Sequence, residues 1–201
     1  MHISEGVLTP QMLAAGWAIA GVGVGIGLKK VNTDKIVRVA LFSSVFFLAS
    51  LVNVRLGPVS THLSLLAPIG LVLGWSAFPA VFTALLLQAV LFHFGGLWVL
   101  GANTTDMALP ALVVYLLFSE TVQKRGSKIS LVAAFIAGFL AVIMGALGIG
   151  VFMGLSDQNL MGVVRVVFLA HIPLAFAEGA ITAFMVVFLQ KAAPELLTGV
   201  K

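Results

Sequence analysis

The chain begins Met1-His2, and this dipeptide is the part of the sequence best suited to bind a transition metal. An N-terminal Xaa-His pair offers three nitrogens in succession: the α-amine, the amide nitrogen of residue 2 and the imidazole Nδ1 atom of His2. Bound to one ion, they close a five-membered and a six-membered chelate ring and fill three corners of a square. Such ligation suits Ni(II) or Cu(II) better than Mg, Ca or tetrahedral Zn. The simpler interpretation is a polar histidine on a disordered terminus.

The fourth corner needs a ligand from elsewhere, and the other histidines compete for it. His62, in "VSTHL", is our first choice, because it lies near the outer end of a predicted span, within reach of the N-terminal segment. His93, in "LFHFGG", also lies near an outer end and could serve the path by which the ion arrives.

His171 and Glu178 are seven residues apart, on one face of a predicted helix. An ionisable pair inside a membrane is costly to desolvate and is therefore a functional hypothesis. The simpler interpretation, which we favour, is that both side chains hydrogen-bond within the bundle and position the ligands without touching metal.

Composition places these residues in a membrane protein. Of 201 residues, 61% are hydrophobic and 9% charged, against about a quarter charged in soluble domains. Apolar stretches of about 20 residues, long enough to cross a bilayer as helices, recur along the chain. We predict an all-α fold with a single domain over residues 1–201, in which segment 1–9 precedes seven spanning helices. Their approximate ranges are 10–28, 36–54, 59–75, 77–94, 106–121, 129–154 and 163–190. The break between the third and fourth is assigned to "GWSAFP".

The basic residues indicate topology rather than a nucleic-acid partner, because they lie in short connections and not in one patch. The chain has 11 lysines and arginines. If the N-terminus is outside, only Arg55 and Arg165 are external and all the others are cytoplasmic, as the positive-inside rule favours. We therefore expect a multi-pass protein of the cell membrane with a cytoplasmic C-terminus and with Glu5, Asp106 and Asp157 on the outer face. The start lacks the basic n-region and cleavage site of a signal peptide, so we expect Met1 and its α-amine to be retained.

Several activities are disfavoured by missing motifs. The sequence has no cysteine, which excludes disulfides and thiolate ligands. It has neither G-x-x-x-x-G-K-[ST] nor H-E-x-x-H, so we expect no ATP hydrolysis and no metalloprotease activity. Uphill transport by this chain would need an ion gradient or a partner subunit.

Small residues recur in the first predicted helix. Gly21 and Gly25, and likewise Gly23 and Gly27, have the spacing that lets membrane helices pack closely. This spacing is equally compatible with packing inside the chain and with docking of a partner's helix.

Four stretches together resemble one family: "MHISEG", "VSTHL" at 59–63, "LLLQAVLFHFGGLWVLGANTTDMALPA" at 85–111 and "EGAITAFMVVFLQKAAPELL" at 178–197. They are similar to the NikM/CbiM family, the substrate-binding S components of nickel/cobalt energy-coupling-factor transporters. The resemblance implies a seven-helix bundle whose N-terminal segment inserts into a central cavity on the outer side. It further implies that the Met1 amine, the His2 amide and imidazole nitrogens, and His62 bind Ni²⁺ or Co²⁺ as substrate, with no separate cofactor. Candidates for lining that cavity are Ser60, His93, Asn103, His171 and Glu178.

The same resemblance implies partners within the lipid bilayer: a transmembrane coupling subunit, two ATP-binding cassette ATPases and often a further small membrane subunit. The main alternative is an ion-coupled secondary cation transporter that uses His171 and Glu178 as a relay. A membrane scaffold with an incidental metal site is a third interpretation. The choice between nickel and cobalt stays open, since low-spin Co(II) accepts the same square of nitrogens.

Overall fold

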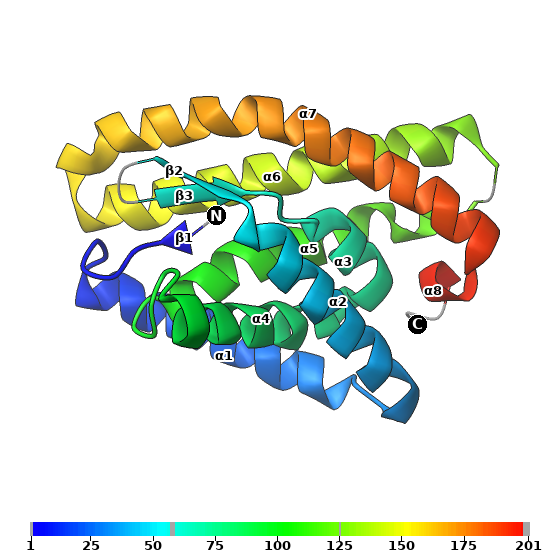
Figure 1. The fold of residues 1–201 in the computed structure, drawn as a ribbon, viewed down its shortest axis with the longest axis horizontal. Helices are drawn as coiled ribbons and strands as arrows, with labels where there is room; N and C mark the ends of the chain where they lie inside the picture. The colour runs from blue at the N-terminus through cyan, green and yellow to red at the C-terminus, as the bar shows by residue number, and fades with distance from the viewer. Residues whose placement is uncertain (1, 57–58, 125, 199–201) are drawn as a thin grey trace.

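The chain is mostly helical, with one small sheet near its N-terminus (Figure 1). The computed structural model describes residues 2–56, 59–124 and 126–198, so Met1 lies outside the described residues. The elements are β1 (His2–Ile3), α1 (Pro10–Lys29), α2 (Thr33–Leu51), β2 (Asn53–Leu56), β3 (Val59–His62), α3 (Leu66–Leu73), η1 (Gly74–Ser76), α4 (Ala77–Phe92), α5 (Leu100–Val122), α6 (Lys128–Ser156), η2 (Gln158–Leu160), α7 (Met161–Ala192) and α8 (Glu195–Thr198).

Within the described residues, 5 helical stretches are long and apolar enough to cross a membrane. They are Pro10–Lys29, Leu66–Phe92, Leu100–Val122, Lys128–Ser156 and Gln158–Ala192. The sequence predicts seven spans, and one difference is α2. This helix is 19 residues long, but the charged residues in its first two turns dilute its apolar character. It also ends at Leu51, earlier than the predicted boundary at 54, because the chain there enters the sheet.

The second difference is the predicted helix at 59–75, which is wrong in its first part. Val59–His62 form strand β3, and α3 has only 8 residues. A helix of that length is about 12 Å long, well short of a hydrocarbon core of about 30 Å. The expected break is present: Gly74, with a φ of 55°, turns the chain through η1 into α4. Periodicity misleads here because a short run rich in β-branched residues fits a strand or a helix equally well.

Two helices form the centre of the bundle. All residues of α3 are buried, as is the stretch Leu100–Ala108 of α5. Helix α5 packs against α1, α3, α4 and α6, and it begins six residues before the predicted boundary at 106. Helices α6 and α7 are the longest and lie side by side along one flank (Figure 1). Polar residues at the start of α5 are therefore enclosed by protein on several sides.

The sheet has the strand order β1-β3-β2, and both pairings are antiparallel. His2 pairs with Ser60 and Ile3 with Val59, while Asn53 on the other side pairs with His62. Buried backbone groups must find hydrogen-bond partners, and this pairing supplies them for the N-terminal strand. The sheet lies beside the α6–α7 flank, far from α8 and the C-terminus (Figure 1).

The two glycine pairs of α1 face different surroundings. A Cβ atom at Gly23 would overlap the ring of Phe78, and one at Gly27 would come within 2.5 Å of the Cδ atom of Pro79. Gly21 and Gly25 would meet nothing within 4 Å. Packing within the chain therefore accounts for Gly23 and Gly27, whereas Gly21 and Gly25 lie on an open face of the helix.

This difference predicts opposite outcomes for two matched substitutions. Gly23→Leu is expected to destabilise the protein by about 1–3 kcal/mol, because the added side chain must displace a buried ring. Gly21→Leu is expected to leave stability nearly unchanged. Thermal unfolding of both variants in detergent measures the difference, and equal melting temperatures would contradict the packing of α1 against α4.

Candidate metal-binding site

His2 and His62 lie side by side in the sheet. Their ring centroids are 4.8 Å apart, and both residues are 3% exposed. His62 is two residues beyond Ser60, the partner of His2, so both rings are on the same face of the sheet. The pairing of β1 with β3 thus brings together two histidines that are sixty residues apart in the sequence.

The ring nitrogens of these histidines have distinct partners. The Nε2 atom of His2 lies 2.8 Å from Oε1 of Gln88, whereas its buried Nδ1 atom has no hydrogen-bond partner among the described residues. The Nδ1 atom of His62 lies 3.0 Å from the carbonyl oxygen of Leu63. Because a carbonyl oxygen only accepts, these bonds place the ring hydrogens on His2 Nε2 and His62 Nδ1. The lone pairs are then on His2 Nδ1 and His62 Nε2.

Burial keeps both rings neutral. It lowers the pKa of His2 to about 3 and lowers the pKa of His62 well below its ordinary value. Both residues lie in strands outside the candidate spans. Aromatic rings contribute to this enclosure: Phe46 is 6.1 Å from His62 and Phe94 is 6.2 Å from His2, measured between ring centroids. A neutral imidazole is the form that binds a metal ion.

The segment after His2 is fixed by hydrogen bonds to α5 and to the loop before it. Asn103 makes a two-point contact with Ile3, accepting from its amide at 2.9 Å and donating to its carbonyl at 3.1 Å. Glu5 donates its amide to Gly95 at 3.1 Å and accepts from the Trp98 amide at 3.0 Å. The position of His2 is therefore defined from both sides, by the sheet and by these contacts.

His171 and Glu178 hold the chain on either side of His62. The Nδ1 atom of His171 is 2.6 Å from the Val167 carbonyl, so its Nε2 atom accepts from the Thr61 hydroxyl at 3.2 Å. The Glu178 carboxylate accepts from the Ser64 amide, from the Ser64 hydroxyl at 2.9 Å and from the Leu65 amide at 3.0 Å.

These contacts connect both α7 residues to the segment that carries His62. Leu65 has a φ of 51°, an uncommon conformation for a residue with a side chain, and the carboxylate of Glu178 holds it. In the described part of the chain, His171 and Glu178 bond to the 61–65 segment rather than to each other. Hydrogen bonds of this kind are what the simpler sequence interpretation expects, and its statement that neither side chain touches the metal stays a prediction.

Replacing this carboxylate is expected to be costly. Glu178→Gln substitutes a donor for one acceptor oxygen against buried amides, which should destabilise the protein by about 2–4 kcal/mol. The matched control is Glu120→Gln, because Glu120 lies on the exposed side of α5, where we expect less than about 0.5 kcal/mol. Thermal unfolding of the metal-free variants measures both. A Glu178→Gln protein as stable as the control would contradict the stabilising role of the Glu178 hydrogen bonds to Ser64 and Leu65.

Other predicted site residues lie elsewhere or are only partly described. His93 is exposed at the C-terminal cap of α4, with a φ of 56°. The backbone of Ser60 pairs with His2, and its side chain is outside the described part of the structure, as is Met1. Among the described residues, no group of three or more His, Cys, Asp or Glu could hold a metal ion. A complete ligand set therefore needs more than the side chains of His2 and His62.

Asp106, which the sequence places on the outer side of the membrane, is buried. It is 3% exposed and lies inside the bundle, against Gly148 of α6. Neither carboxyl oxygen has a hydrogen-bond partner among the described residues. The reason is the early start of α5, which encloses residues that a later boundary would leave in a loop.

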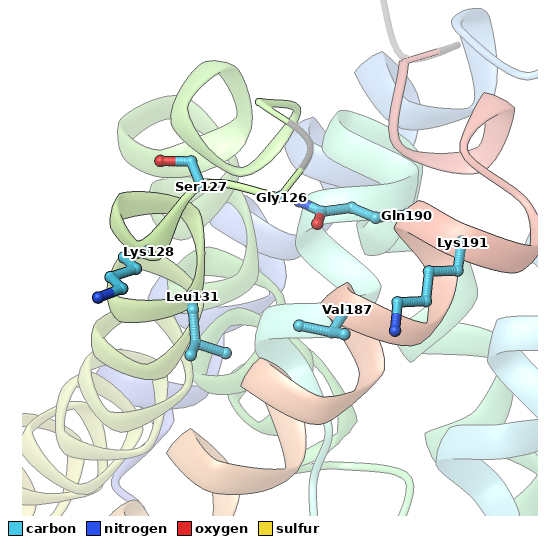
Figure 2. Close-up of a pocket in the computed structure, with 7 residues that line it drawn as sticks. All are labelled: Gly126, Ser127, Lys128, Leu131, Val187, Gln190 and Lys191. Carbon is cyan, nitrogen blue, oxygen red and sulfur yellow. The ribbon is translucent and has the colours of Figure 1, made fainter.

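A separate pocket lies where α6 begins and α7 ends, away from the histidines. Figure 2 shows Lys128 and Lys191 on opposite sides of it, with Leu131 and Val187 between them. Its volume is about 450 Å³. With two amines and no imidazole or carboxylate in its lining, it offers no donor set for a transition metal.

Sequence reasoning missed Gln88 and the contacts of Thr61, Ser64 and Leu65. A signal for Gln88 was present, because this amide interrupts the apolar run "ALLLQAVLF" within a predicted span. A fully buried amide in such a run must find partners, but its contact with His2 of the N-terminal strand was not visible in the sequence.

Fold and site together define a multi-pass helical membrane protein with two buried neutral histidines beside its N-terminal strand. A family model described as "Cobalt uptake substrate-specific transmembrane region" matches residues 2–196. The chain belongs to this family, CbiM, and is a membrane protein of cobalt and nickel transport.

Named relatives and a solved structure are similar over nearly all of the chain. A Haemophilus influenzae protein named for metal transport is 37% identical over 199 residues, covering 98% of this chain and 97% of its own. The cobalt transport protein CbiM of Geobacter sulfurreducens is 30% identical over 98% of this chain and 61% of its own length. The crystal structure of a truncated transition metal transporter superimposes with a TM-score of 0.80 at 25% identity, covering 94% of this chain and 98% of that one.

Proposed function

We propose that this chain is the substrate-binding subunit of an energy-coupled transporter that takes up Ni²⁺ or Co²⁺. The observation that carries the proposal is the buried pair of His2 and His62, in which the Nδ1 atom of His2 has no partner in the described part of the chain. A buried nitrogen lone pair without a donor is costly to leave unsatisfied. A metal ion would satisfy it.

The proposed ligands are the Met1 α-amine, the His2 amide nitrogen, His2 Nδ1 and His62 Nε2. In this arrangement the two imidazoles occupy adjacent corners of a square. At metal–nitrogen distances of about 2.0–2.1 Å, adjacent imidazoles have centroids roughly 4–5 Å apart. The observed 4.8 Å is consistent with that arrangement.

The ion arrives at the outer face, and its binding holds the N-terminal segment in the central cavity. Asn103, His171 and Glu178 position the ligand-bearing strands. A coupling subunit, two ATP-binding cassette ATPases and an additional small membrane subunit supply the energy and the change of access. The open face of α1 at Gly21 and Gly25 is available to a partner's helix.

Calorimetric titration of purified protein with an authentic Met1 tests the capture step. We expect one Ni(II) per chain and release of about two protons per ion near pH 7, one from the α-amine and one from the amide. Binding without proton release would contradict the amine and amide ligands. No binding at all would contradict the proposed function.

Reconstitution separates this function from an ion-coupled carrier. Proteoliposomes that contain this chain alone, with an imposed proton or sodium gradient, are expected to accumulate no radioactive nickel. Gradient-driven accumulation that Glu178→Gln abolishes while leaving metal binding intact would instead support the secondary transporter.

A further inference from the structure

The amide of Gln88 is held in a single orientation by helix α2. Its Nε2 atom donates to the Ser50 hydroxyl and lies 3.4 Å from the Phe47 carbonyl. Ser50 in turn donates to the Phe46 carbonyl at 2.8 Å. Since a backbone carbonyl cannot donate, the NH₂ group must face α2, and the amide oxygen must face His2.

This orientation determines which nitrogen of His2 carries the hydrogen. The oxygen of Gln88 lies 2.8 Å from His2 Nε2 and can only accept, so Nε2 must be protonated. The opposite tautomer would place two acceptors against each other in a fully buried setting. The lone pair is thereby directed to Nδ1, the one ring nitrogen of His2 that has no partner among the described residues.

We propose that Gln88 is a positioning residue for metal capture: anchored by Ser50 and Phe47, it presets the Nε2–H tautomer and the orientation of the His2 ring. This inference rests on the proposed function, in which His2 Nδ1 binds the ion. A metal-bound imidazole generally donates its other N–H to an oxygen acceptor, and that contact raises the affinity of the site. Gln88 places this acceptor before the ion arrives.

The first test needs no substitution. Metal-free protein labelled with ¹⁵N-histidine gives separate signals for protonated and unprotonated ring nitrogens, and loss of a signal in His2→Asn assigns those of His2. We expect the Nε2–H tautomer in the wild-type protein. A predominantly Nδ1–H ring would overturn the inference, whatever the metal affinity.

The second test compares three variants by Ni(II) titration. Gln88→Leu removes the acceptor and should lower affinity by about 10- to 100-fold, the usual effect of removing such a partner. Gln88→Glu keeps an acceptor oxygen and should retain most of the affinity and the Nε2–H tautomer. The matched control is Gln190→Leu, because Gln190 likewise donates to a backbone carbonyl, that of Val122, and to a serine hydroxyl, that of Ser130.

Gln190 lines the separate pocket of Figure 2 and makes no contact with His2 or His62 in the hydrogen bonds described above. If Gln88→Leu and Gln190→Leu bind nickel equally well, the inference fails while the proposed function stands. If the wild-type protein binds no nickel, the proposed function fails, and the tautomer measurement still decides what Gln88 does to His2.

Discussion

Adding an extension of several residues before Met1 is expected to abolish high-affinity metal binding at the proposed site. The extension converts the basic α-amine, which anchors the chelate, into a far less basic amide. It must be longer than one residue, because Xaa-Met-His would present a new terminal amine, two amides and the imidazole to the same ion. Loss of an outer partner alone costs about 10- to 100-fold, so loss of this ligand should cost at least about 100-fold in Ni(II) affinity. Calorimetric titration of the extended protein against one with an authentic Met1 measures the change.

The control for this experiment is reversal. A cleavable extension whose removal regenerates Met1 should restore the original affinity in the same preparation, which separates ligand loss from misfolding. Extended protein that binds nickel as tightly as the cleaved protein would rule out the α-amine as a ligand. The ion would then have to be bound without the chain terminus.

Replacing His62 is the second substitution with a large expected effect. His62→Asn removes the imidazole that lies 4.8 Å from His2 and keeps a polar side chain of smaller size in the strand. We again expect a loss of at least about 100-fold in affinity, since the proposed fourth ligand is removed. At a nickel concentration about 1,000 times the wild-type dissociation constant, metal should stabilise the wild-type protein by about 4 kcal/mol and this variant by only about 1.4 kcal/mol.

His93→Asn is the matched control, because it removes an exposed histidine at a position where asparagine tolerates the observed φ of 56°. Thermal shifts with and without nickel compare the two variants directly. Equal metal-induced shifts in both would exclude His62 as a ligand. If only His93→Asn reduced the nickel-induced thermal shift, the metal-binding site would instead include the loop before α5.

The α7 contacts connect the site to the longest helix of the bundle. His171 and Glu178 hold residues 61, 64 and 65, so β3 and the start of α3 cannot shift without changing contacts to α7. A substitution at either residue therefore affects the site through the position of His62. A positioning effect lowers the stability of the metal-free protein, whereas direct loss of a ligand lowers only the stabilisation that nickel adds.

Much about this protein could be determined from the sequence alone. Composition and apolar runs were sufficient to predict that the chain is a membrane protein and to locate most of its helices, because burial in lipid requires long uncharged segments. The Met1-His2 start suggested a nitrogen chelate, since those ligands are adjacent in the chain, and that chelate stays a prediction. The family followed from motifs spread along the sequence, and comparison with known proteins confirms it.

Only the tertiary structure decided how distant residues combine. Strand β3 forms where the sequence predicts the first part of a helix, because its backbone pairs with β1 on one side and β2 on the other. β1 is distant in the sequence, and local hydrophobic periodicity cannot predict such a pairing. Pairing of β1 with β3 placed His62, the first choice by sequence, beside His2, while His93, the other histidine near an outer end, lies exposed. Gln88 hydrogen-bonds to Ser50 of α2 and to His2 of β1, two elements distant from it in the sequence. Hydrogen bonds between distant segments produce no periodic pattern, so the sequence did not predict these contacts.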